Sequence, residues 1–133
     1  GKFLLVEEVV EGKTVYNQPA GHIDENESIP VAALRETLEE TAWKVEITDL
    51  VGIYTLKSEK PGVTYYRFCF AATPVEQTNL PLDHGIVGPR WFTLEEVKAL
   101  GSQLRSPLVV KCIEDYIAGK RFPLDLIYEH PIG

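Results

Sequence analysis

Three glutamates and an arginine occupy six residues of one stretch, ALRETLEET at residues 33–41, that has the pattern of a helix. Ser28 is a suitable N-cap and Pro30 is tolerated in a first turn, so we expect the helix to run from about 29 to 41. Residues three and four apart on a helix are neighbours, which places Glu36, Glu39 and Glu40 on one face. Such a face is either solvated surface or a group of oxygens that gathers divalent cations.

A short loop leads toward this helix, Asn17 to Gly21, with the sequence NQPAG. Its proline and glycine favour a fixed shape in which a backbone carbonyl faces the same carboxylates. Carboxylates, a carbonyl and water are ligands that Mg²⁺ takes, usually together with substrate phosphate. Arg35 can reach Glu39 at the i,i+4 spacing and hold it without adding a metal-binding atom. The surroundings of the helix therefore favour a cation site.

The rest of the chain alternates strand-like and helical segments. We expect strands at 2–10, 14–17, 45–57, 63–72 and 90–92, hairpin turns at 11–13 and 58–62, a loop at 73–88, and helices at 94–100 and from about 108 to Gly119. No repeat or long linker divides residues 1–133, so we expect one α/β domain with a mixed β-sheet flanked by helices.

Composition narrows the classes of function. The net charge of −7 disfavours nucleic-acid binding, and no apolar run approaches the roughly 20 residues of a membrane span, so a soluble protein is expected. Cys69 and Cys112 lack the spacing of a metal site or disulfide framework, which favours reduced core thiols and a cytoplasmic location. The sequence starts at Gly1 and contains no methionine, so we expect natural residues to precede it.

The loop and the helix together resemble the signature of the Nudix hydrolases: Gly, five residues, Glu, seven residues, then Arg-Glu-apolar-x-Glu-Glu-x-Gly-apolar. Here the matching residues are Gly21, Glu27 and the run RETLEETAW at 35–43, with every charged position present. Thr37 replaces an aliphatic residue. Ala42 replaces the glycine that ends the helix, where alanine costs about 1 kcal/mol or extends the helix.

The resemblance implies an α/β/α sandwich around a mixed sheet, with one strand preceding Gly1. It implies a Mg²⁺ site, with Mn²⁺ as a substitute, and assigns its ligands and the residues that orient them. The implied ligands are Glu36, Glu39, Glu40 and the Ala20 carbonyl, and the orienting residues are Glu27 and Arg35. The general base stays open between Glu39 or Glu40 and a later loop that offers Asp83 and His84.

Segments outside the signature resemble one branch of the family, the phosphatases of small diphosphates and triphosphates. They are residues 1–4 with 6–8, 17–22, 67–68 with 70–71, and LRSPLV at 104–109. The resemblance implies release of orthophosphate from nucleoside di- and triphosphates, hydroxymethylpyrimidine diphosphate and thiamine diphosphate, by a monomer or homodimer. The alternatives are a pyrophosphohydrolase that releases pyrophosphate and a nucleotide-binding Nudix module without turnover, although such modules usually lose a signature glutamate.

Two residues are candidates for binding the small phosphorylated substrate. Tyr16 ends a strand beside the loop and either stacks on a base or belongs to the core. Arg67 lies on an otherwise apolar strand and either faces solvent or lines a phosphate pocket. His22 is expected to be a loop residue without chemistry.

Overall fold

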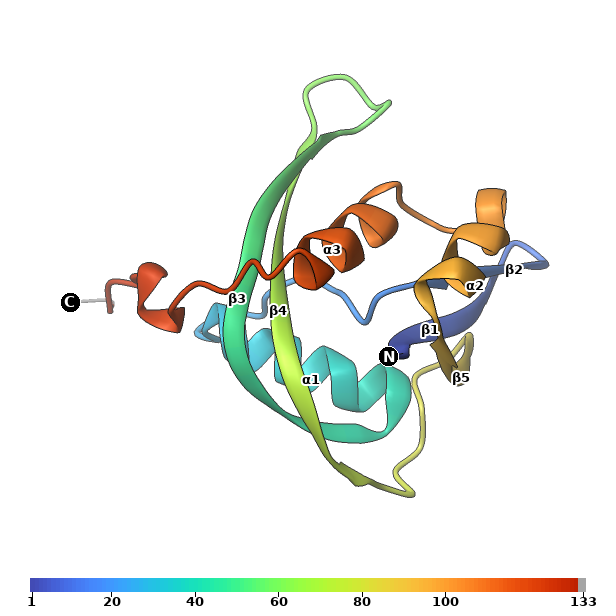
Figure 1. The fold of residues 1–133 in the computed structure, drawn as a ribbon, viewed down its shortest axis with the longest axis horizontal. Helices are drawn as coiled ribbons and strands as arrows, with labels where there is room; N and C mark the ends of the chain where they lie inside the picture. The colour runs from blue at the N-terminus through green and yellow to red at the C-terminus, as the bar shows by residue number, and fades with distance from the viewer. Residues whose placement is uncertain (132–133) are drawn as a thin grey trace.

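The computed structural model describes residues 1–131 and shows strands and helices in the order that the sequence predicts (Figure 1). The elements are β1 (Phe3–Val10), β2 (Lys13–Asn17), α1 (Ile29–Thr41), β3 (Trp43–Lys57), β4 (Thr64–Gln77), β5 (Ile86–Phe92), α2 (Leu94–Leu100), the 3-10 helix η1 (Gly101–Gln103), α3 (Leu108–Ile117) and the 3-10 helix η2 (Leu124–Leu126).

The strands form two antiparallel sheets, β2-β1-β5 and β3-β4, which corrects the expected mixed sheet. Short turns join β1 to β2 and β3 to β4, and such turns permit only antiparallel neighbours. Among residues 1–131 the parallel pairing is limited to an isolated bridge between Tyr16 and Leu104. The α+β class and the helix-flanked architecture are confirmed.

The helices cover the sheets from different sides. In Figure 1, β1, β2 and β5 lie to the right of α1 and α3, and β3 and β4 form a long curved pair beside these two helices. The helix α1 packs against β3 and β5, whereas α3 packs against β3 and α2. The glutamate-bearing helix is thus held between two sheets.

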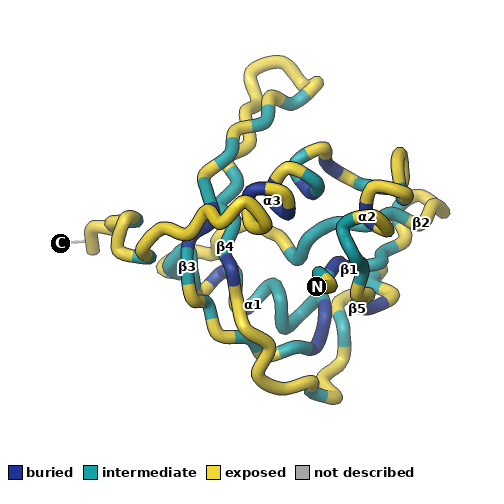
Figure 2. The backbone as a smooth tube through the Cα atoms, in the orientation of Figure 1, coloured by how far each residue is buried: buried dark blue, intermediate teal, exposed yellow. Residues whose placement is uncertain are grey.

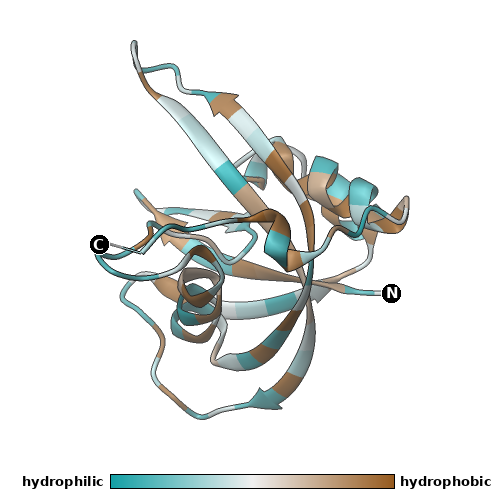
Figure 3. Cartoon of the chain, turned by 90° about the vertical axis from the view of Figure 1, so that its left-hand side faces the viewer, coloured by the Kyte–Doolittle hydropathy of each residue, from teal (hydrophilic) through white to brown (hydrophobic). Residues whose placement is uncertain are grey.

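The main core cluster lies between β1 and the two later helices. Leu5 contributes from β1, Val97 from α2, and Val109 and Ile113 from α3, and all four are buried. Figure 2 shows that the tip of the β3–β4 hairpin and the C-terminal segment are mostly exposed. Figure 3 shows apolar and polar residues alternating along the long strands, as expected for strands with one covered face.

The predicted helices and hairpins are confirmed, but the expected loop at 73–88 is wrong at both ends. Strand β4 continues to Gln77 and β5 already begins at Ile86. The polar residues after position 72 stay paired because β3 extends back to Trp43. A register shift beside Pro74 leaves Val75 of β4 unmatched. Both cysteines are free, with Cys112 buried and Cys69 half-buried. No helix in the described range has the length and apolar character needed to cross a membrane.

Candidate active site

Local capping fixes both ends of α1. The Ser28 hydroxyl accepts a hydrogen bond from the Val31 N–H at 3.2 Å, as predicted. At the other end the helix stops at Thr41, and Ala42 adopts the left-handed conformation with φ 61° and ψ 14°. Its carbonyl accepts bonds from the Thr78 N–H at 2.8 Å and the Thr78 hydroxyl at 2.7 Å. Alanine therefore takes the conformation of the signature glycine and does not extend the helix.

Arg35 is the centre of the carboxylate cluster. A guanidinium has five N–H donors, and here they make five hydrogen bonds of 2.7–3.0 Å. Two go to Glu27, one each to Glu36 and Glu39, and one to the His22 carbonyl. Bonding to Glu27 is the main cause that raises the Arg35 pKa, and the same bond lowers the pKa of Glu27. Arg35 thus links Glu27 to two of the helix glutamates, and the orienting roles of Arg35 and Glu27 stay predictions.

The loop before the helix contacts two of the helix glutamates, Glu40 and Glu36. The Ala20 N–H donates to Glu40 Oε1 at 2.9 Å. A Cβ built on Gly21 would overlap the Glu36 carboxylate, so only glycine allows this approach. Burial raises the pKa of Glu36, and it raises the pKa of Glu40 to about 7 despite the bond from Ala20.

The later loop also reaches the helix. The Asp83 N–H donates to the Glu39 carbonyl at 3.1 Å, and after burial the Asp83 charge is one of the causes that raise the pKa of Glu36 and Glu40. His84 is exposed. Glu8 of β1 likewise contributes to the raised pKa of Glu40, a proximity that sequence reasoning missed because the two residues lie in distant segments.

The donor chemistry of this cluster suits Mg²⁺, since hard carboxylate oxygens gather on one helix face. The Arg35 Nη1 bonds both Glu36 Oε1 and Glu39 Oε1 at 2.7 Å, so these oxygens lie no more than twice that distance apart. Within residues 1–131 no three acidic, histidine or cysteine side chains already converge on a metal position.

The two substrate-binding candidates lie in different surroundings. The Tyr16 ring packs edge-on against Phe92 with centroids 5.6 Å apart, and its hydroxyl donates to Glu7 at 3.4 Å. Tyr16 thus packs against the core cluster, as its alternative interpretation predicts, and is not brought to the glutamates. Arg67 Nη1 donates to Gln18 Oε1 at 3.1 Å, which brings this cation to the loop that holds Ala20.

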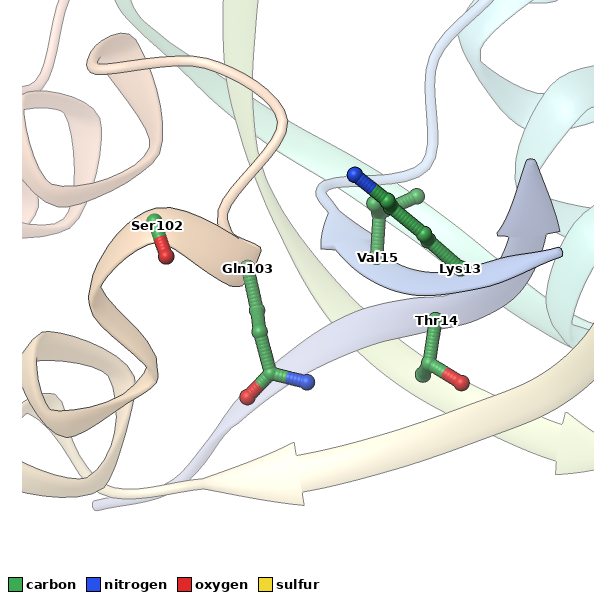
Figure 4. Close-up of a pocket in the computed structure, with 5 residues that line it drawn as sticks. All are labelled: Lys13, Thr14, Val15, Ser102 and Gln103. Atoms are coloured by element: carbon green, nitrogen blue, oxygen red, sulfur yellow. The ribbon is translucent and has the colours of Figure 1, made fainter. Parts of the chain in front are cut away.

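A surface hollow of about 560 Å³ lies apart from the glutamates, between β2 and η1 (Figure 4). Its lining contains no carboxylate and consists of Lys13, Thr14, Val15, Ser102 and Gln103. The hollow therefore shares no lining residue with the carboxylate cluster of α1.

Known proteins share both the sequence and the fold. The NUDIX domain profile matches residues 1–111. Phosphatase NudJ of Escherichia coli K12 is 40% identical over 130 residues, which cover 96% of this chain and 82% of that protein, and NudJ of Shigella flexneri matches equally. A NUDIX hydrolase structure from Nitrosomonas europaea is 45% identical with a TM-score of 0.91, covering 97% of this chain and 88% of that one.

A more distant structure, a UDP-X diphosphatase, is 18% identical with a TM-score of 0.69 over 91% of this chain and 59% of that one, and shows the fold alone. NudJ phosphatases are also the branch whose segments the sequence resembles, including the LRSPLV run at 104–109. With the signature carboxylates gathered around one arginine on the predicted helix, the chain belongs to the Nudix hydrolases, enzymes of phosphoanhydride bonds, and within them is similar to the NudJ phosphatases.

Proposed function

We propose that the protein is a Mg²⁺-dependent phosphatase that hydrolyses small di- and triphosphates and releases orthophosphate. The substrates would be nucleoside di- and triphosphates, hydroxymethylpyrimidine diphosphate and thiamine diphosphate, with Mn²⁺ able to replace Mg²⁺. The observation that supports this most is the packing of the NQPAG loop onto the carboxylates of α1, through Ala20 on Glu40 and Gly21 against Glu36. The phosphatase name of the relatives supports orthophosphate as the product.

The residues that would hold the ion are Glu36, Glu39, Glu40 and the Ala20 carbonyl. Bound Mg²⁺ supplies positive charge for the phosphate oxygens and lowers the pKa of the attacking water. The protein itself contributes orientation, because Arg35 and its partner carboxylates share a closed set of hydrogen bonds. Arg67, held beside the loop by Gln18, is a candidate contact for a substrate phosphate.

The base that takes the proton from water would be Glu39 or Glu40 of this cluster, or else Asp83 or His84 of the later loop. A positioned base contributes roughly 10²- to 10⁴-fold to the rate, so the kcat values of four single variants separate these candidates. The variants compared are Glu39→Gln, Glu40→Gln, Asp83→Asn and His84→Ala. We expect Asp83→Asn to lower kcat less than either glutamate variant, because the bond of Asp83 to α1 uses its backbone.

The function is tested by incubating the protein with millimolar Mg²⁺ and each substrate, and by measuring orthophosphate and pyrophosphate separately. Orthophosphate release from several substrates, reduced at least about 100-fold in Glu40→Gln, is the expected result. Glu46→Gln, which changes an exposed glutamate of β3, is the matched control and should keep wild-type activity. Pyrophosphate alone would indicate a pyrophosphohydrolase, and binding without turnover would indicate a nucleotide-binding module.

We further propose that residues 1–133 form one domain. The protein would work in the cytoplasm as a monomer or homodimer. The free thiols of Cys69 and Cys112 support a reducing compartment. Light scattering on the purified protein gives the assembly state, and a stable mass of three or more chains would contradict the proposal.

A further inference from the structure

Arg105 lies in the segment that joins η1 to α3, and its backbone is fixed on both sides. Its N–H donates to the Tyr16 carbonyl at 2.9 Å, and the preceding Leu104 forms the parallel bridge to Tyr16. The following Ser106 is buried and its hydroxyl accepts the Leu108 N–H at 3.1 Å. The segment is therefore attached to the end of β2, just before the loop that carries Ala20.

The Arg105 side chain is aimed by Glu8. Its Nη1 donates to Glu8 Oε1 at 2.6 Å, and the Glu8 side chain is only 16% exposed. In β1, Glu8 pairs with Ile86, whose N–H bonds the Asp83 carbonyl. Because Asp83 in turn bonds the Glu39 carbonyl, this end of β1 lies next to the end of α1 that bears the glutamates.

The neighbouring residue of β1 provides an internal comparison. Successive strand residues point to opposite faces, and Glu7 and Glu8 each hold an arginine. The register shift at this step places the unmatched residue, Val87, in β5 and not in β1. Glu7 bonds Arg90 at 2.7 Å on the face where Tyr16 packs against the core cluster. Glu8 bonds Arg105 on the other face, which the proximity of Glu8 to Glu40 identifies as the face of the carboxylate cluster.

Phosphate oxygens that no metal ion covers need cationic donors. Arg35 cannot supply them, since all five of its donors are already bonded. Arg105 differs, because its guanidinium uses a single donor within residues 1–131, the bond to Glu8, and its side chain is 51% exposed. A guanidinium with free donors can bind phosphate through two parallel hydrogen bonds.

We propose that Arg105 binds a phosphate group of the substrate through its free N–H donors, and that Glu8 positions it for this contact. The assignment deepens the proposed function and rests on it, since it places the substrate phosphates between the carboxylate cluster of α1 and the end of β2. It makes Arg105 a residue that determines specificity for substrates with an accessible phosphate.

Binding of α,β-methylene-ADP, which a phosphatase cannot cleave between its phosphates, is measured calorimetrically in millimolar Mg²⁺. Loss of charge-assisted bonds predicts a Kd raised roughly 10- to 100-fold in Arg105→Gln. Arg105→Lys keeps the charge but lacks the paired donors of a guanidinium, so its Kd should lie between those of Arg105→Gln and wild type. Arg90→Gln removes the matched arginine on the opposite face, and its Kd should stay within about twofold of the wild-type value.

The double variant Glu8→Gln with Arg105→Gln separates direct contact from an effect of the freed Glu8 charge. If Arg105 touches phosphate, the double variant stays as weak as Arg105→Gln, whereas recovery of wild-type affinity overturns the proposal. An unchanged Kd in Arg105→Gln, with turnover intact in wild type, also overturns it without affecting the proposed function. If the wild-type protein hydrolyses no substrate and Arg105→Gln still weakens binding of the analogue, the phosphate contact is supported and the hydrolase proposal is contradicted.

Discussion

The Cα of Gly21 lies so close to the Glu36 carboxylate that a methyl group at position 21 would overlap its oxygens. The φ angle of Gly21 is not in the left-handed region, so glycine is needed here for space and not for backbone freedom. This contact joins the first residue of the signature to the first glutamate of its helix and gives the spacing between them a physical meaning.

Gly21→Ala should therefore impair catalysis far more than folding. The clash falls on the end of a flexible side chain, so Glu36 can move away at a stability cost of about 1 kcal/mol. A displacement of about 1 Å in a metal-binding carboxylate is enough to lower kcat/KM roughly 100-fold. Steady-state kinetics and urea unfolding measure the two effects. A fall in stability that matches the fall in activity would contradict this account, as would wild-type activity.

Arg35→Lys should lower kcat/KM at least about 100-fold although it keeps the charge. Lysine offers three donors at one point and cannot reproduce the planar set of bonds to Glu27, Glu36 and Glu39. The matched control is Arg121→Lys, which changes an arginine that bonds only backbone carbonyls in the described part of the chain and lies over Tyr116. Equal activity of the two lysine variants would show that charge alone suffices at position 35.

Ala42→Gly should change the free energy of unfolding by no more than about 1 kcal/mol. Relief of the left-handed conformation favours glycine by about 1 kcal/mol, whereas the added freedom of the unfolded chain and the lost burial of a methyl group oppose it by a similar amount. Ala42→Val should destabilise by about 2 kcal/mol or more, since a β-branched residue fits φ 61° poorly. Equal stability of the glycine and valine variants would show that the conformation at 42 is not retained.

Asp115 gives a pH-dependent contribution to stability. It is buried, and hydrogen bonds from the Tyr54 hydroxyl at 2.7 Å and then from Lys111 at 3.0 Å lower its pKa. A carboxyl with a lowered folded pKa stabilises the protein above its unfolded pKa of about 3.9, and this contribution is lost as the pH falls through the folded pKa.

Asp115→Asn should therefore unfold at a lower denaturant concentration than wild type at pH 7, and the difference should shrink as the pH falls below about 4. Glu114→Gln, which changes the exposed neighbour on α3, should match wild type throughout. Urea unfolding at pH 7, 4 and 3 measures the effect. A constant difference between wild type and Asp115→Asn across this range would exclude the charge of Asp115 as its cause.

The sequence by itself determined the parts of the protein that depend on neighbours along the chain. The helix at 29–41, its Ser28 cap and the shared face of the glutamates follow from helical periodicity and from a side chain that reaches three residues ahead. The hairpins follow from their short turns, and the Nudix signature follows from the spacing of its charges. These features are set by interactions within a few residues.

Tertiary structure decided what depends on partners distant in sequence. Thr78 holds Ala42 in the left-handed conformation, Phe92 draws Tyr16 to the core cluster, and β3 keeps the polar end of β4 in a sheet. The bond between Glu8 and Arg105 joins residues 97 positions apart, so no local pattern predicts it. Packing chooses such partners because burial and hydrogen bonding are satisfied over the whole fold at once, and strand neighbours that are remote in sequence carry side chains to the same face.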